Sequence, residues 1–105
     1  SSPNLRIIFD PVNIISIDNY KNQDEILTEA FDLLGEEIAA IHSKDFVIED
    51  NKVISKITGE GILNYNLLMK LAKEHKPYIH ILLEGTSPSN VEFAKEFITK
   101  KYKEA

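Results

Sequence analysis

Three apolar, strand-like runs of this sequence each end in a residue type that binds metal ions. The first run closes with FDPVN, which contains Asp10, the second with IHSKDF, which contains His42, and the third with ILLEGTSPS, which contains Glu84. Two carboxylates and one imidazole make a mixed oxygen and nitrogen donor set, which suits divalent Mn, Zn, Co or Mg. Such chemistry requires a fold that brings the three side chains together.

The first expected elements are a strand and a helix. Residues 5–10 are apolar and β-favouring except at Arg6 and the closing Asp10, and a proline follows Asp10, so we expect a short buried strand there. Asn22, with Glu25 three residues later, resembles a capping box, and Gly35 is placed as a C-terminal stop. Hydrophobic residues recur at helical spacing between these two signals, which predicts a helix.

The same pattern of a strand and then a helix recurs with one addition. EIAAIHSKDF at 37–46 is typical of a second strand, and YNLLMKLAKEHK at 65–76 of a second helix. Between them, apolar residues alternate on both sides of Asp50–Asn51, which predicts a small hairpin insertion at about 46–57.

YIHILLEG at 78–85 predicts a third strand, and residues 87–102 a third helix. Ser87 is placed as the N-cap of this helix and Pro88 at its first position. The order is therefore βα-βα-βα. Nearly continuous apolar strands in that order indicate an α/β fold in which helices cover a parallel sheet.

Parallel strands place their carboxyl ends at the same side of a sheet, so residues at those ends converge in space. His42 follows Asp10 by 32 residues and Glu84 follows His42 by 42 residues, each about one βα unit. Singly, such residues are commonly turn formers, helix caps or solvated side chains. Three of them at corresponding strand ends favour a shared metal or catalytic site.

Composition limits the other functions that are open to the chain. Its 105 residues allow one domain at most, and a net charge of −5 with no cluster of Lys or Arg before the TKKYKE tail disfavours nucleic-acid binding. The absence of cysteine suits a cytoplasmic protein. No apolar run approaches the roughly 20 residues that span a bilayer. The chain begins at Ser1 without a methionine, so we expect a processed or truncated product.

Four motifs together resemble a known family. FDPVN, IHSKDF, the GEG of Gly59–Gly61 followed by LNY, and LLEGT are similar in order and spacing to the C-terminal part of the xylose isomerase-like TIM barrels, a group of sugar phosphate isomerases and epimerases. The resemblance covers essentially the whole chain. It implies that residues 1–105 are a C-terminal fragment with three consecutive βα units of a (β/α)8 barrel, with helices on the outer face of the sheet.

The resemblance also implies a ligand set. In that family a Glu, an Asp, a His and a final Glu on the last four strands hold a divalent metal, and Asp10, His42 and Glu84 match the last three. The first Glu would precede Ser1. Family epimerases use the two Glu carboxylates as acid and base beside a carbonyl, with the metal polarising the oxygens. Glu84 would then be both a metal ligand and the catalytic proton carrier.

Four further residues are candidates for substrate binding. Asn13 stands where many relatives place a His that contacts the substrate, and an amide can hydrogen-bond a sugar hydroxyl. Lys44 and Asp45 match the family's H-x-K-D pattern, although a salt-bridged strand end is an equal alternative for Lys44. Glu60, in a Gly-flanked loop, could reach the mouth of the site or could serve the loop structure alone.

The expected function of the parent protein is a metal-dependent sugar or sugar-phosphate isomerase or epimerase. One alternative is a non-catalytic TIM-barrel module that binds a ligand or partner. Another is a phosphodiesterase like the abasic-site endonucleases, which the acidic balance and the small number of His disfavour. The expected partners are a small sugar or sugar phosphate, and neither nucleic acid nor membrane.

Three units alone are expected to be inactive and to self-associate. Without the rest of a barrel, both sheet edges would be open and the inner face would be bare. Alternation along the strands places these apolar side chains on that face: Ile8, Ile38, Ala40 and Leu82.

Overall fold

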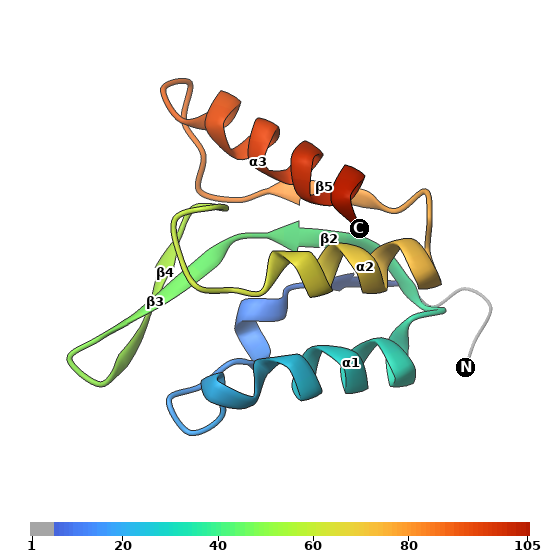
Figure 1. Ribbon diagram of the computed structural model, residues 1–105, viewed down its shortest axis with the longest axis horizontal. Helices are drawn as coiled ribbons and strands as arrows, with labels where there is room; N and C mark the ends of the chain where they lie inside the picture. Colours follow the sequence, from blue (N-terminus) through green and yellow to red (C-terminus); the bar gives the residue numbers. More distant parts are fainter. Residues whose placement is uncertain (1–5) are drawn as a thin grey trace.

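The computed structural model describes residues 6–105 and has an α/β fold built on a three-stranded parallel sheet (Figure 1). The sheet contains β1 (Ile7–Phe9), β2 (Ile38–Ser43) and β5 (His80–Leu83) in the order β1-β2-β5. The α/β class and the parallel sheet predicted from the sequence are confirmed. Leu5, where the first strand was expected to begin, lies outside the described residues.

Three helices follow the three strands: α1 (Gln23–Leu34), α2 (Tyr65–His75) and α3 (Val91–Glu104). Gly35 ends α1 as expected, whereas Asn22 stands at its N-cap position without a side-chain capping bond. Two 3-10 turns, η1 (Pro11–Ile14) and η2 (Tyr20–Asn22), connect β1 to α1. Within residues 6–105, no helix is both long and apolar enough to cross a membrane.

The start of α3 differs from the prediction. The helix begins at Val91 with Asn90 as its N-cap, so the placement of Ser87 as N-cap and Pro88 at the first helical position was wrong. Asn90 instead accepts a hydrogen bond through Oδ1 from the backbone N–H of Ser87 at 2.6 Å. This local side-chain bond holds residues 87–90 in a turn, which competes with another turn of helix.

The hydrophobic core lies between one face of the sheet and the helices, which lie side by side with α2 in the middle (Figure 1). Phe9 of β1 meets Phe31 of α1 edge to face, with ring centroids 5.5 Å apart. On the other side, Tyr65 of α2 meets Phe97 of α3 at 5.3 Å in the same geometry. The first contact packs α1 against the sheet, and the second packs α3 against α2.

A hairpin separates β2 from α2. It consists of β3 (Asp45–Glu49) and β4 (Lys52–Lys56), close to the range of about 46–57 that the alternation indicated. Its turn is Asp50–Asn51, and both residues have positive φ, 49° and 60°. That is the conformation of a type I′ turn, whose twist suits a two-residue hairpin loop and which Asp and Asn tolerate well.

The pairing of β1 with β2 contains an irregularity that changes the predicted faces. Ile7 pairs with Ile38, but Ile8 pairs with Ala40, so one residue of β2 is skipped in the register. As a result Ile38 is fully buried in the core, and its predicted place on the bare face was wrong. Ile8 and Leu82 are 61% and 45% exposed, and they leave an apolar strip on the face opposite the helices.

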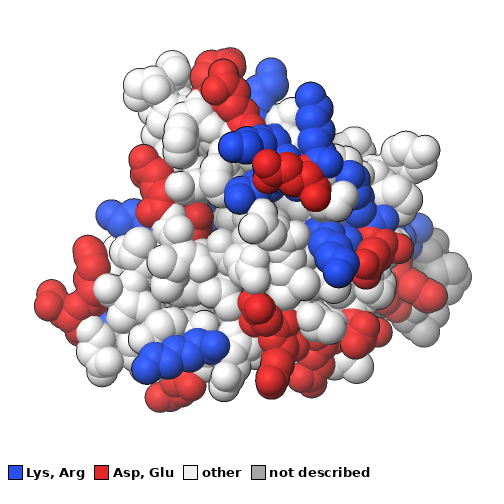
Figure 2. Space-filling view, viewed as in Figure 1, with Lys and Arg blue, Asp and Glu red and all other residues white. Residues whose placement is uncertain are grey.

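Both outer edges of the sheet are open within the described chain, because β1 and β5 pair only with β2. The helices beside these edges differ in charge. In Figure 2 acidic side chains predominate in the lower part of the molecule, over α1, while the lysines gather in the upper half. Helix α1 contributes Asp24, Glu25, Glu29 and Asp32, and α3 contributes Lys95, Lys100, Lys101 and Lys103 among three glutamates.

Candidate metal centre

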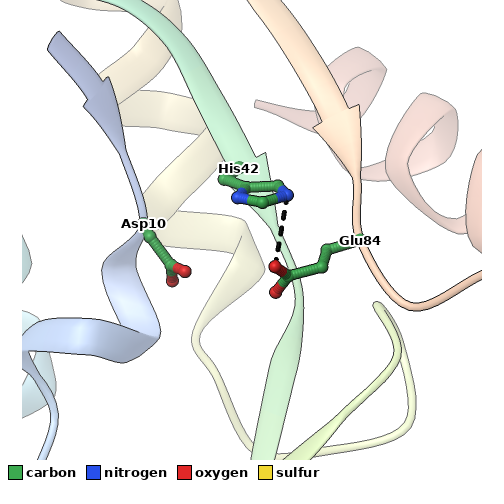
Figure 3. A group of neighbouring side chains, drawn as sticks. All are labelled: Asp10, His42 and Glu84. Atoms are coloured by element: carbon green, nitrogen blue, oxygen red, sulfur yellow. Dashed lines mark ion pairs between the residues drawn. The ribbon is translucent and has the colours of Figure 1, made fainter.

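The carboxyl ends of the three parallel strands bring Asp10, His42 and Glu84 together (Figure 3). One ligand atom from each of the three lies within 4.8 Å of the other two. All three residues are partly exposed, so the cluster lies at the protein surface and not in the core. Residues far apart in the sequence thus form one group of two carboxylates and an imidazole.

Asp10 is held by the turn that follows β1. It is the N-cap of η1, and its Oδ1 accepts a hydrogen bond from the backbone N–H of Val12 at 3.0 Å. Pro11 occupies the first position of that turn, where its missing N–H costs nothing. One carboxylate oxygen of Asp10 is therefore used to cap the turn, and Oδ2 faces the other side chains of the site.

His42 and Glu84 are aligned by the pairing of β2 with β5. His42 lies opposite Leu82 in the ladder, and the backbone N–H of Glu84 donates to the carbonyl oxygen of Ser43 at 3.0 Å. This bond continues the ladder past the end of β5. It places His42 Nε2 3.4 Å from Glu84 Oε1 (Figure 3).

Lys44 connects the two carboxylates. Its Nζ lies 3.1 Å from Asp10 Oδ2 and 3.2 Å from Glu84 Oε2, and its side chain is only 16% exposed. Burial lowers the pKa of Lys44, but hydrogen bonding and charge attraction from Asp10 and Glu84 raise it by more, so the net pKa lies above its usual value. The site therefore contains a permanent cation between its two carboxylates.

Alternation along IHSKDF separates two groups of side chains. His42 points toward Glu84, and Lys44 points toward Asp10 and Glu84. Ser43 between them is fully buried in a polar network. Ser43 Oγ lies 2.7 Å from Thr58 Oγ1 and 2.8 Å from the hydroxyl of Tyr65. The Tyr65 hydroxyl donates to the carbonyl oxygen of Lys44, and burial raises its pKa to about 12, so it acts as a neutral donor.

This network was not predicted from the sequence. Tyr65 stands only as the first residue of the predicted second helix, and neither Ser43 nor Thr58 is singled out by the sequence. The signal was present in part, because the i, i+2 rule that places His42 and Lys44 on one face places Ser43 on the other. The network fixes the backbone of the strand on which both His42 and Lys44 are carried.

Asp45 lies apart from the three-residue cluster. It is 1% exposed, and its carboxylate accepts backbone N–H bonds from Phe46 at 2.9 Å, Leu63 at 2.9 Å and Gly59 at 3.1 Å. Burial raises its pKa, and these backbone donors offset that rise only in part. The carboxylate thus holds the loop between β4 and α2 and is not presented to a substrate.

The loop that Asp45 holds contains the GEG motif. Gly59 has a φ of 92°, which favours glycine, and a Cβ on Gly61 would collide with the backbone oxygen of Phe46. The two glycines therefore allow the loop to approach Asp45 closely. Glu60 between them is exposed, as is Asn13 on η1. Among the described residues, the cluster of Asp10, His42 and Glu84 contains neither Glu60 nor any fourth acidic or His ligand.

Comparison of the chain with protein-family models, with curated proteins and with solved structures finds no match. The chemistry of the cluster must therefore indicate the function. Two carboxylates, an imidazole and an ammonium group converge at the strand ends, where α/β folds commonly bind ligands. Such a group can bind a divalent cation, transfer a proton or form a structural ion-pair network.

Proposed function

We propose that this chain carries the metal-binding half of a metal-dependent sugar or sugar-phosphate isomerase or epimerase, and that it forms three βα units of a TIM barrel. The observation that carries the proposal is the convergence of Asp10, His42 and Glu84 at three neighbouring strand ends. The same end of the barrel is where enzymes of this architecture place their active sites. The motif resemblance of FDPVN, IHSKDF and LLEGT supports the sugar chemistry.

The residues of the cluster fit a divalent cation. Their ligand atoms lie within 4.8 Å of one another, a spacing from which small rotamer changes bring three ligands to one ion. The position between the carboxylates already attracts positive charge, since the Lys44 ammonium lies there. Asp10, His42 and Glu84 would hold Mn, Zn, Co or Mg, and the mixed donor set does not select among them.

The side chains divide the chemistry of such a reaction. A bound divalent ion supplies polarisation of the sugar oxygens. Glu84, half-exposed at the end of β5, can accept and return the proton on the carbon next to the carbonyl. His42 and Asp10 orient the site, and the exposed Asn13 amide and Lys44 can hydrogen-bond sugar oxygens. In the complete barrel that we propose, the second acid or base would be the first Glu of the four-residue ligand set of the resembling family.

The proposal is tested by proton exchange. The parent barrel is incubated in deuterated water with a panel of ketoses and ketose phosphates, and isotope uptake at the carbon beside the carbonyl is followed by NMR. We expect uptake that requires added divalent metal and is abolished by a chelator and by His42→Ala. Metal-independent uptake, or none with any sugar in the panel, would contradict the proposal.

A second candidate is a non-catalytic module, which one observation favours. Lys44 already pairs with both carboxylates, so Asp10, Lys44 and Glu84 can tie the strand ends together as an ion-pair network without any metal. In that case Glu84→Gln would lower the stability of the metal-free protein, and the wild-type protein would show no metal binding at all. Metal binding that depends on His42 distinguishes the enzyme from this alternative.

A further inference from the structure

We propose that Lys44 is an internal counter-cation which a divalent metal must displace, so that the protein exchanges its own ammonium group for the metal. This inference rests on the proposed function, because it concerns the same three ligands. It assigns to Lys44 a positioning role that is distinct from contact with the substrate. It also explains how two carboxylates can be held close together before any metal binds.

The distances show why the two cations compete. Lys44 Nζ is 3.1 Å from Asp10 Oδ2 and 3.2 Å from Glu84 Oε2. Asp10 Oδ1 already accepts the N–H of Val12, so Oδ2 is the oxygen that a metal would use. The ammonium group therefore engages a carboxylate oxygen of each acidic ligand, and a divalent ion between the same carboxylates would repel it strongly.

The imidazole is placed differently. His42 Nε2 lies 3.4 Å from Glu84 Oε1, whereas Lys44 Nζ lies against the other oxygen of that carboxylate, Oε2. His42 Nε2 and Glu84 Oε1 would therefore be available to a metal while Lys44 holds the other two oxygens. Asp10 Oδ2 and Glu84 Oε2 would become available as ligands only when Lys44 leaves them.

The surroundings leave room for the released side chain. A shallow hollow adjoins the site and is lined by Lys44, Ser55, Lys56, Ile57, Glu84 and Gly85. A lysine has a flexible four-carbon stem, so its ammonium can turn into such a hollow while the backbone stays fixed. The backbone of Lys44 is indeed held, because its carbonyl oxygen accepts the Tyr65 hydroxyl.

The first experiment measures metal affinity in the full chain. Mn²⁺ binding is followed by electron paramagnetic resonance for the wild type, Lys44→Met and Lys44→Arg, with Lys52→Met as a control that makes the same change in net charge on the exposed hairpin. We expect Lys44→Met to bind Mn²⁺ about tenfold more tightly or better, since a divalent ion no longer opposes a nearby cation. Lys44→Arg and Lys52→Met should stay within about threefold of the wild type.

The second experiment needs no variant. The wild-type chain is treated with a limiting amount of acetic anhydride at rising Mn²⁺, and acetylation of each lysine is measured by mass spectrometry. Lys44 should be protected without metal and become several-fold more reactive with it, whereas the exposed Lys52 should not change. This readout remains valid if Lys44→Met does not fold in the absence of metal.

The outcomes separate the two proposals. Tighter binding by Lys44→Met together with metal-induced reactivity of Lys44 supports the exchange. Wild-type binding that depends on His42, but is unchanged or weakened in Lys44→Met with no gain in Lys44 reactivity, overturns the exchange and leaves the metal site intact. Absence of binding in the wild type, Lys44→Met and Lys44→Arg alike overturns the metal site itself, and the exchange with it.

Discussion

The backbone N–H of Glu84 donates to the carbonyl oxygen of Ser43 across 3.0 Å, one residue beyond the last residue of β5. Glu84 is therefore positioned by the sheet and not by a loop. The bond places its carboxylate beside His42, whose Nε2 lies 3.4 Å from Glu84 Oε1. A catalytic or ligand residue fixed in this way has little freedom to lose when a metal or substrate binds.

Glu84→Gln is expected to separate catalysis from metal binding. In the complete barrel that we propose, glutamine keeps a neutral oxygen ligand but cannot carry a proton. Turnover should fall by about 10²–10⁴-fold, the usual contribution of a general base. Metal affinity, measured by calorimetry, should fall by less than turnover.

Glu92→Gln is a matched control, because it makes the same substitution at an exposed residue in the first turn of α3. It should leave turnover and metal affinity at wild-type values. If the Glu84→Gln protein had the wild-type turnover rate, Glu84 would not be the catalytic base. Glu84 would then be a metal ligand without a catalytic role.

Asp45→Ala is expected to destabilise the fold strongly. The substitution leaves the backbone N–H groups of Phe46, Gly59 and Leu63 without their acceptor, and each buried donor left unpaired costs about 1–3 kcal/mol. The free energy of unfolding, measured in urea, should therefore fall by roughly 3 kcal/mol or more. Asp32→Ala, at an exposed position of α1, should change it by less than about 0.5 kcal/mol. A similar small change in both variants would contradict the role assigned to Asp45.

The pH dependence of stability should also show Asp45. Burial raises its pKa in the folded protein above the ordinary value of 3.8, so the folded state holds this proton more tightly than the unfolded state. Its contribution is full below that value and is lost as the pH rises through the folded pKa. The stability of the wild type relative to Asp45→Asn, measured in urea, should therefore decline as the pH is raised from 3.8 toward neutrality. A difference that stays constant would show that the backbone donors balance burial, and one that grows with pH would show that they outweigh it.

The sequence was sufficient to predict the convergence of the site, because that prediction needs only strand order and strand ends. Parallel strands put Asp10, His42 and Glu84 at one edge whatever the details of their packing. The hairpin was equally predictable, since Asp50–Asn51 interrupts a clear alternation and both residue types tolerate the positive φ that the turn adopts.

Features that depend on distant contacts were not predictable. Ile7 pairs with Ile38 and Ile8 with Ala40, and the residue skipped between them changes the face of β2 so that Ile38 points into the core. No local pattern in the sequence IAAI indicates this irregularity. Asp45 matches a motif that suggests substrate binding, yet its carboxylate bonds to the backbone of Leu63, 18 residues away. Only tertiary structure reveals which of these uses the side chain has.

The chain is expected to self-associate at high concentration. Its two open strand edges, β1 and β5, and the exposed Ile8 and Leu82 are surfaces that commonly pair with another copy. Sedimentation should show a weight-average mass that rises with protein concentration. Leu82→Lys should reduce the association, whereas Leu33→Lys, an exposed leucine on α1 and not on the sheet, should reduce it less. A monomer at every concentration would contradict the expectation.

The chain alone is expected to bind divalent metal weakly and to have no isomerase activity. Its described residues offer three ligands where the barrel that we propose would use four, and Lys44 opposes the incoming cation. Losing a single supporting contact around a metal commonly costs about 10–100-fold in affinity, and a missing ligand should cost more. Calorimetric titration with Mn²⁺ or Zn²⁺ should therefore show no tight stoichiometric event, although weak binding stays detectable by electron paramagnetic resonance at high Mn²⁺. In the complete barrel that we propose, with a fourth carboxylate ligand, binding should be tight. A tight one-to-one complex formed by this chain alone would show instead that Asp10, His42 and Glu84 are sufficient, and that the fourth carboxylate serves catalysis only.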